Sequence, residues 1–92
     1  SRERRFRFKR NDEIDCDEIL FERLRGFRQE LASKAGVPAY IIFGDVSLRE
    51  MARDCPVTME AFGLINGVGE KKKAKFGESF ISEIAAHLSE MD

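Results

Sequence analysis

Residues 37–45, VPAYIIFGD, decide the fold class of this 92-residue chain. The apolar run from Tyr40 to Phe43 is typical of a buried β-strand. A strand must pair with another strand, however, and no second segment of the sequence has a strand pattern. We therefore expect a short helical turn over this stretch and an all-α fold for the chain.

The first long helix is predicted over residues 16–35. Its apolar positions share one helical face: Leu20, Leu24, Phe27 and Leu31. Asp15 with Glu18 three residues later forms a capping-box pattern at the start. Gly36 supplies a left-handed stop, and Pro38 cannot continue the helix.

The last long helix is predicted from about Gly69 to Ser89. Its apolar positions recur every four residues: Phe76, Phe80, Ile84 and Leu88. Ile81 and Ala85 widen this stripe toward the core. Two long helices therefore flank two or three short ones.

The short helices are predicted from capping signals. Ser47 and Glu50 form a second capping box before LREMARDC, which Pro56 ends. The positions expected to face inward are Leu48, Met51 and Ala52. Thr58 caps the next short helix, MEAFGLI.

No catalytic or metal site is expected. The single histidine, His87, falls near the end of the last helix, and we expect it to be a surface or helix-end residue and not a catalytic base. No Ser or Cys stands in a nucleophile motif, and the carboxylates are scattered. Cys16 and Cys55 have neither metal-ligand nor disulfide spacing, which suggests reduced thiols in an intracellular protein. The sequence therefore predicts no enzyme, no metal and no cofactor.

Composition and charge suggest one domain joined to a basic arm. The chain is 42% hydrophobic and 36% charged, with neither a bilayer-spanning run nor a signal-peptide pattern. Residues 1–10 hold six of the 16 Lys and Arg and one of the 17 Asp and Glu, so the arm is +5 and the rest −6. We expect residues 1–14 to be a basic arm or interdomain linker, and residues 15–92 to be the domain. The Arg and Phe of the arm could grip phosphates and bases.

Residues 64–77, LINGVGEKKKAKFG, allow two interpretations. Gly67 and Gly69 can expose successive N–H groups at a helix N-terminus, where the helix dipole favours a phosphate. Three nearby lysines would support that role: Lys71, Lys72 and Lys75. Alternatively, this is an ordinary turn between helices followed by a solvated lysine face.

Tyr40 is the second candidate for nucleic-acid contact. Beside basic side chains it would form a stacking platform for a single-stranded base. Those candidate neighbours are Arg23, Arg28 and Lys34. A core tyrosine whose hydroxyl reaches the surface is the alternative.

Two long segments together resemble a known family. They are LFERLRGFRQELASKAGVPAYIIFGDVSLREMA and CPVTMEAFGLINGVGEKKKAKFGESFISEI, within residues 17–88. The most specific parts are VPAYIIFGDVSLREMA and INGVGEKKKAKFG, in order and at the family spacing. The chain thus resembles the HRDC (helicase and RNase D C-terminal) domain, most of all that of bacterial RecQ-type DNA helicases.

The resemblance implies a compact five-helix bundle without catalytic activity, tethered to a helicase motor. Its Gly-Val-Gly turn would be similar to helix-hairpin-helix elements, which grip phosphates through backbone N–H groups. Tyr40 matches an aromatic residue linked to single-strand binding in some members. Lys72 matches a lysine that in others binds DNA or contacts the motor. The resemblance also implies a monomer in the bacterial cytoplasm, associated with the nucleoid and not with a membrane.

Two functions follow as hypotheses. The first is an accessory module that binds single-stranded or partly duplex DNA weakly and tunes substrate choice in recombination and repair. The second is a protein-interaction module that docks on the parent helicase motor or a repair protein through its acidic surface. The net acidic body weakens long-range attraction to DNA and favours the second.

Overall fold

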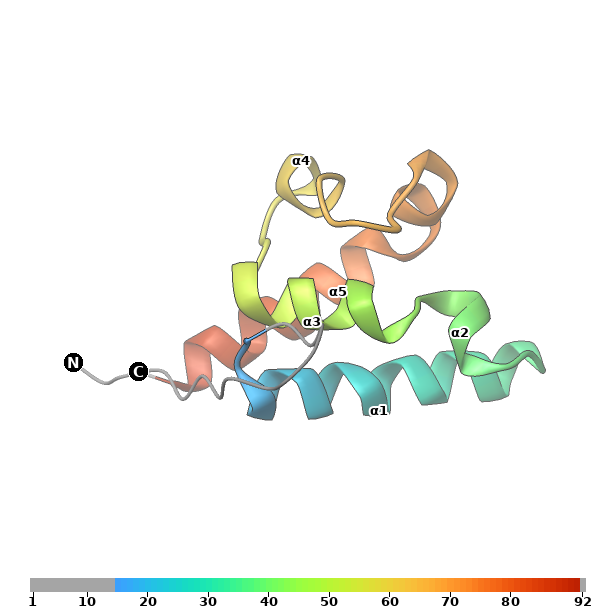
Figure 1. The fold of residues 1–92 in the computed structure, drawn as a ribbon, viewed down its shortest axis with the longest axis horizontal. Helices are drawn as coiled ribbons and strands as arrows, with labels where there is room; N and C mark the ends of the chain where they lie inside the picture. The colour runs from blue at the N-terminus through green and yellow to red at the C-terminus, as the bar shows by residue number, and fades with distance from the viewer. Residues whose placement is uncertain (1–14, 92) are drawn as a thin grey trace.

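The computed structural model describes residues 15–91, so the predicted basic arm, residues 1–14, lies outside the described part. The elements of residues 15–91 are five α-helices, as predicted (Figure 1). They are α1 (Glu18–Ala35), α2 (Ala39–Ile42), α3 (Asp45–Asp54), α4 (Met59–Phe62) and α5 (Glu70–Glu90).

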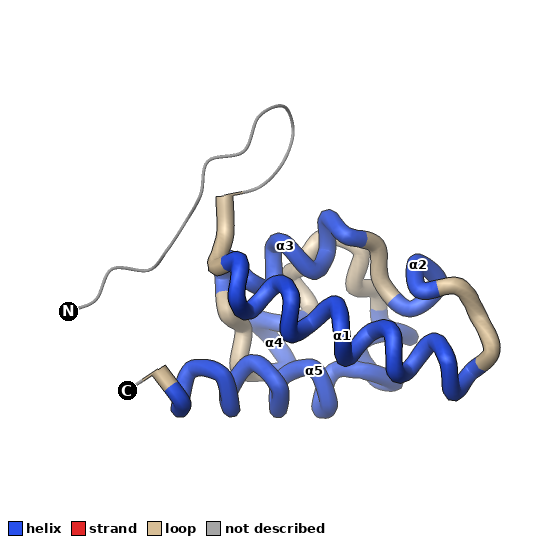
Figure 2. Tube along the Cα trace, turned by 90° about the horizontal axis from the view of Figure 1, so that it is seen from below, coloured by secondary structure: helices blue, strands red, loops and turns tan. Residues whose placement is uncertain are grey.

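The two long helices run antiparallel and side by side (Figures 1 and 2). Arg23, near the start of α1, donates to Glu83 at 2.9 Å and to Glu90 at 3.1 Å, both near the end of α5. Helices α2 and α3 pack on α1, and α4 packs on α5. The beginning of α5 therefore lies at the same end of the molecule as α2 and the end of α1.

Phe43 forms the centre of the core. Its backbone leaves the helical conformation (φ −154°, ψ 147°), which ends α2 after four residues. The ring is 1% exposed and meets Phe62, Phe76 and Phe80 edge-on, with centroid distances of 6.0, 5.7 and 5.1 Å. Such edge-to-face pairs add about 0.5–1.5 kcal/mol each beyond area burial. The expected short helical turn is confirmed, and its apolar run supplies the ring that joins α4 and α5.

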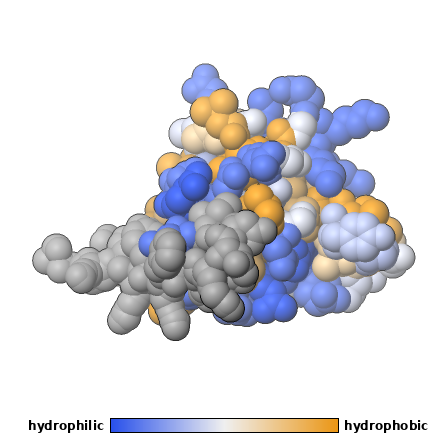
Figure 3. Space-filling view, in the orientation of Figure 1, coloured by the Kyte–Doolittle hydropathy of each residue, from blue (hydrophilic) through white to orange (hydrophobic). Residues whose placement is uncertain are grey.

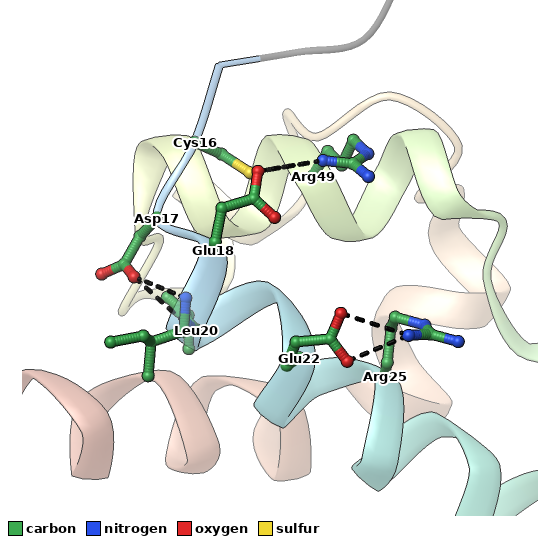
Figure 4. Close-up of polar contacts among 8 residues, drawn as sticks. Cys16, Asp17, Glu18, Leu20, Glu22, Arg25 and Arg49 are labelled. Carbon is green, nitrogen blue, oxygen red and sulfur yellow. Dashed lines mark hydrogen bonds and ion pairs between the residues drawn. The ribbon is translucent and has the colours of Figure 1, made fainter. Parts of the chain in front are cut away.

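The cap of α1 is Asp17, not the predicted Asp15. Asp17 Oδ1 accepts hydrogen bonds from the backbone N–H groups of Ile19 and Leu20, at 3.0 and 3.1 Å. Figure 4 shows Asp17 turned toward Leu20, and Glu18 turned toward Arg49. Cys16 is fully buried while Asp15 is exposed, so the helix begins two residues later than the capping-box pattern indicated.

His87 lies in the last turn of α5, so it is a helix-end residue as expected, but it is not at the surface. Its ring is buried, and Nε2 lies 3.2 Å from Asp17 Oδ2, so one carboxylate both caps α1 and contacts α5. Ala85, expected to widen the apolar stripe, is exposed, whereas Ile81 packs against the core as predicted. The buried positions of α5 are Gly77, Phe80, Ile84 and His87.

The second predicted capping box is also wrong. Helix α3 begins at Asp45 with Gly44 as its N-cap, which leaves Ser47 inside the helix. Ser47 Oγ donates to the Asn66 carbonyl at 2.6 Å, and Glu50 Oε1 accepts from the Asn66 N–H at 2.9 Å. The two residues fix the turn before α5 against α3. The inward positions of α3 are as predicted: Leu48, Met51 and Ala52.

Two other helix ends follow the sequence prediction. Gly36 adopts the left-handed conformation after α1, with φ 71°. Thr58 caps α4 by accepting from the Ala61 N–H at 3.1 Å.

Candidate functional site

A groove lies between the beginning of α5 on one side and α2 with the end of α1 on the other. Its volume is about 350 Å³. The floor and walls are largely apolar, and three lysines of α5 complete the lining: Leu31, Ala35, Val37, Ile41, Ile42 and Phe76, with Lys71, Lys72 and Lys75. This α2–α5 groove combines positive charge with an apolar interior.

The α5 lysines divide between the groove and the opposite side. Lys72 Nζ lies 5.5 Å from the ring centroid of Phe43, and Lys75 Nζ lies 5.6 Å from that of Phe76. Both distances are within the range of about 6 Å for cation–π attraction. Lys73 instead lies 3.7 Å from Glu70 and runs against Gly63, where a Cβ would come within 3.0 Å of Lys73 Cδ. Spacing along the helix thus turns three of the four lysines to the groove.

The two glycines before α5 differ in what they permit. Gly67 has φ 89°, and a Cβ there would overlap Ser47 Oγ, so this position requires glycine. Gly69 is the N-cap of α5, with φ −87°, and a Cβ there would meet nothing within 4 Å. Gly69 provides no side-chain cap, so the first-turn N–H groups of α5 gain no acceptor from their N-cap residue.

Tyr40 is exposed, with 69% of its surface accessible, and is not a core tyrosine. Its neighbour Ile41 lines the groove, and Lys34 precedes the groove residue Ala35 on the last turn of α1. In Figure 3, hydrophobic and hydrophilic side chains lie next to one another at the end of the molecule that carries α2. The predicted residues that share this end are Lys34, Tyr40, Lys71, Lys72 and Lys75.

Arg23 and Arg28 do not share that surface. The Arg28 guanidinium is buried and donates to the Phe43 carbonyl and to Asp45 Oδ1, both at 2.9 Å. Arg23 pairs with Glu83 and Glu90 nearer the start of α1, and its hydrogen bond to Glu83 raises the pKa of the guanidinium. Both arginines therefore connect helices and do not extend the stacking surface of Tyr40, contrary to the sequence interpretation.

A second hollow lies between α1 and α5 and has the opposite charge. Its volume is about 280 Å³, and Gly26 and Phe27 form part of its wall. Its charged lining is mainly acidic: Glu22, Glu30 and Glu83, with Arg23. A Cβ at Gly26 would meet nothing within 4 Å, so no packing neighbour accounts for this glycine.

Sequence reasoning missed three aspects of the site. The helical pattern assigned Leu31 and Phe76 wholly to the core, although they also line the groove. Ile41 belongs to an apolar run, but it is 46% exposed whereas the next residue, Ile42, is 4% exposed. The helical pattern also gave no indication that Ser47 and Glu50 of α3 bind Asn66, because these residues are 19 and 16 positions from Asn66 in the sequence.

Residues 15–91 bring together no group of three His, Cys, Asp or Glu that could hold a metal ion. Nor does that part of the chain form a helix with the length and apolar character needed to cross a membrane.

Comparison with known proteins identifies relatives of this sequence. It is 45% identical over 79 residues to the ATP-dependent DNA helicase RecQ of Bacillus subtilis, covering 86% of this chain and 13% of that protein. It is 44% identical over 71 residues to RecQ of Pasteurella multocida, covering 77% of this chain and 11% of that protein. The chain thus spans only about an eighth of the length of the first of these relatives.

The fold has a counterpart among solved structures. HRDC domain 3 of Deinococcus radiodurans RecQ superposes with a TM-score of 0.72 at 32% identity, over 75% of this chain and 91% of that domain. The HRDC domain family itself matches residues 17–84, which include all of α1 to α4 and most of α5. By sequence and by fold, the chain belongs to the HRDC domain family.

Proposed function

We propose that this HRDC domain is the non-catalytic accessory DNA-binding domain of a RecQ-type DNA helicase in the bacterial cytoplasm, associated with the nucleoid. It would bind single-stranded or partly duplex DNA and tune which structures the motor unwinds in recombination and repair. The observation that carries the proposal is the α2–α5 groove, where three lysines adjoin an apolar surface next to the exposed Tyr40.

Each part of the surface has a distinct role in this proposal. The ammonium groups of Lys71, Lys72 and Lys75 would neutralise phosphates along the strand. The ring of Tyr40 would stack on a base, which requires no particular sequence. The uncapped start of α5, after Gly67 and Gly69, would offer N–H groups to one further phosphate. Lys34 lies where it could extend the positive surface along α1.

Binding by this surface should be weak and salt-dependent. Three phosphate contacts predict a slope of log K against log salt of about −2 for a single strand. The dissociation constant expected for such non-specific contacts is roughly 10⁻⁴ to 10⁻⁶ M. Attachment to a motor would raise the effective concentration of DNA at the domain, so weak binding would still select substrates. ATP hydrolysis would belong to the motor.

Fluorescence anisotropy of a labelled oligo-dT tests the proposal. Lys72→Ala and Tyr40→Ala should each weaken binding, while Arg25→Ala removes one charge from the exposed Arg25–Glu22 pair and should have little effect. Lys73→Ala is a closer control, because Lys73 faces away from the groove. Absence of salt-sensitive binding at tens of micromolar protein, or equal loss in all four variants, would reject this function.

The acidic hollow at Gly26 favours a second candidate function. Glu83 in this open, partly aromatic hollow already pairs with Arg23, and Glu22 pairs with Arg25. The excess negative charge at the rim, with Glu30, would be complementary to a basic side chain on the surface of a partner protein. In this role the domain would dock on the helicase motor or on a repair protein, with the hollow receiving a Lys or Arg.

Calorimetry with the purified motor fragment tests docking. Gly26→Ala would partly fill the hollow and Glu30→Lys would reverse its charge, so both should weaken association. Glu60→Lys, on the exposed first turn of α4, is the matched control for charge reversal. No measurable association, or the same loss with Glu60→Lys, would remove the support for docking.

A further inference from the structure

We propose that the α2–α5 groove seats a single unstacked nucleobase in its interior, with the lysines at its edge holding the adjoining phosphates. This inference rests on the proposed DNA-binding function and adds a distinct base site beside Tyr40. It assigns the apolar side chains of the groove, and not only the charged ones, to nucleic-acid contact.

The composition of the groove argues against a phosphate-only site. Phosphate oxygens need donors on every side, and burying them against apolar walls carries a desolvation cost. Six of the nine lining residues are apolar and come from three helices and the segment after α1: Leu31, Ala35, Val37, Ile41, Ile42 and Phe76. A base has apolar faces and polar edges, so it can use the walls and still present acceptors to lysine. The groove volume of about 350 Å³ falls at the lower end of small-molecule sites, which suits one ring system.

The walls are formed before a ligand arrives. Phe76 is held edge-on by Phe43 at 5.7 Å and by Phe80 at 6.4 Å, so its ring is fixed from behind by the core. Ile42 is 4% exposed and also belongs to the core, whereas Ile41 is 46% exposed. A rigid aromatic wall and an accessible aliphatic one therefore face the same space, and little side-chain ordering is needed for binding.

The lysines suit the charged part of a nucleotide. Lys72 and Lys75 lie near the rings of Phe43 and Phe76, with Nζ at 5.5 and 5.6 Å from their centroids. An ammonium group has three donors, so each can contact an aromatic ring and still donate to a phosphate or to a base carbonyl. The charge therefore borders the apolar interior instead of projecting into solvent away from it.

Oligonucleotides with and without bases test this inference on the 92-residue chain. The probes are a labelled oligo-dT and an oligonucleotide of the same length in which abasic sites replace the thymidines, so the phosphates are unchanged. The abasic strand should bind at least about fivefold more weakly, the lower end of the effect of losing one base–side-chain stack. A duplex of the same length should also bind more weakly, because its bases are not available to the groove.

Two variants separate the base site from the phosphate site. Ile41→Ala should weaken binding of oligo-dT severalfold and leave the abasic strand unaffected, whereas Lys72→Ala should weaken both. Ile19→Ala is the control, because it removes another exposed isoleucine (69% exposed against 46% for Ile41) from the first turn of α1, away from the groove, and it should change neither. The exposure of Ile41 makes it tolerant of substitution.

The outcomes distinguish this inference from the function on which it rests. Equal, salt-sensitive binding of both strands would overturn both the base site and the stacking on Tyr40, and would leave phosphate-mediated DNA binding intact. No binding of either strand would reject this inference and the function on which it rests. An acidic peptide that contains Asp and Phe is the alternative ligand. If the chain bound this peptide but not oligo-dT, and Ile41→Ala weakened peptide binding, the nucleobase assignment would be overturned.

Discussion

At the residue scale, the two thiols differ in their surroundings. Cys16 is fully buried, and desolvation, assisted by Glu18, raises the pKa of its thiol above the ordinary value. Cys55 is half-buried. The thiolate is the reactive form, so Cys16 should resist alkylation by iodoacetamide while Cys55 is modified first.

Mass spectrometry of peptides from the native and the urea-unfolded chain measures this difference. Both thiols should react at similar rates once the chain is unfolded. A raised pKa also means that the folded state prefers the protonated thiol, so this group favours folding below its unfolded pKa and disfavours it as pH rises above that value. Faster native labelling of Cys16 than of Cys55 would contradict the described packing.

Asp17 has two roles, and its substitution should lower the free energy of unfolding. Asp17→Ala removes the acceptor for two backbone N–H groups and leaves the buried His87 without this contact. Loss of an N-cap costs about 0.5–2 kcal/mol and an unsatisfied buried polar group about 1–3 kcal/mol. We expect the free energy of unfolding to fall by about 2–4 kcal/mol.

Urea denaturation followed by circular dichroism gives that free energy. Asp15→Ala is the control, because Asp15 is the cap that the sequence pattern predicted and it is exposed in the structure. It should change stability by less than about 0.5 kcal/mol. The reverse order of the two effects would restore Asp15 as the cap.

The residue-level errors share one physical cause. Asp15 was favoured by a local pattern, whereas Asp17 is selected by a contact with His87, 70 positions away. Arg28 was assigned to the surface by its charge, but the Phe43 carbonyl and Asp45 hold it in the interior. Local spacing carries no information about such partners. The untested roles of Tyr40 and Lys72 remain predictions.

At the element scale, Gly26 is an opportunity to stabilise α1. It lies in the interior of an 18-residue helix, and a Cβ there would meet nothing within 4 Å. Gly26→Ala should therefore gain about 1 kcal/mol from helix propensity. For a domain of this size the melting temperature should rise by about 4–8 °C.

Calorimetric melting checks the sign of this effect. Gly36→Ala is the opposing control, because its φ of 71° lies in the left-handed region, where alanine costs about 1–2 kcal/mol. A lowered melting temperature for Gly26→Ala would indicate that the helix needs the glycine for a reason not visible in its contacts.

At Gly69, in the turn before α5, one substitution should raise stability and weaken DNA binding. Gly69→Ser should add a side-chain acceptor for the first-turn N–H groups and stabilise the chain by a few tenths of a kcal/mol. If a phosphate uses the same N–H groups, this variant should bind oligo-dT more weakly.

Denaturation and anisotropy measurements on the same samples are needed. Gly67→Ala should only destabilise, because its φ of 89° and the nearby Ser47 Oγ exclude a Cβ. Stabilised Gly69→Ser with unchanged DNA affinity would remove the start of α5 from the proposed binding surface.

The elements themselves were largely predictable. Long-range apolar periodicity located α1 and α5, and glycine and threonine signals located two helix ends. The single apolar run at residues 37–45 was correctly assigned to a helix because no pairing strand exists in the sequence. The start of α3 was missed because Ser47 and Glu50 fit a capping pattern, although they bond to Asn66.

At the scale of the whole molecule, charge is separated between two faces. The lysine-lined groove lies at the α2 end, and the acidic hollow lies between α1 and α5. The sequence predicted an acidic body but not the separation of charge. The separation depends on the fold, which brings the lysines of α5 next to residues of α1 and α2. In the proposed function, the groove would attract DNA although the body as a whole carries −6 outside residues 1–10.

Deletion of residues 1–10 separates the arm from the groove. The arm carries +5, so its deletion should weaken oligo-dT binding at low salt. If the two regions bind independently, Lys72→Ala should reduce the affinity for oligo-dT by the same factor with and without residues 1–10. Anisotropy at two salt concentrations measures the loss of affinity caused by the deletion and by Lys72→Ala. A Lys72→Ala effect that disappears with the arm would mean that the groove does not bind DNA alone.

The contact between Asp17 and His87 has a mechanical consequence. It brings the beginning of α1 and the end of α5 together, so polypeptide joined at either side leaves from the same end of the domain (Figure 1). The groove lies toward the other end of α1, where Leu31 and Ala35 line it, about 20–26 Å along the helix from Glu18. If a helicase motor were attached at the end where Asp17 and His87 meet, the domain would rotate about the attachment point as a rigid body. A small rotation there would produce a large displacement of the groove relative to the motor.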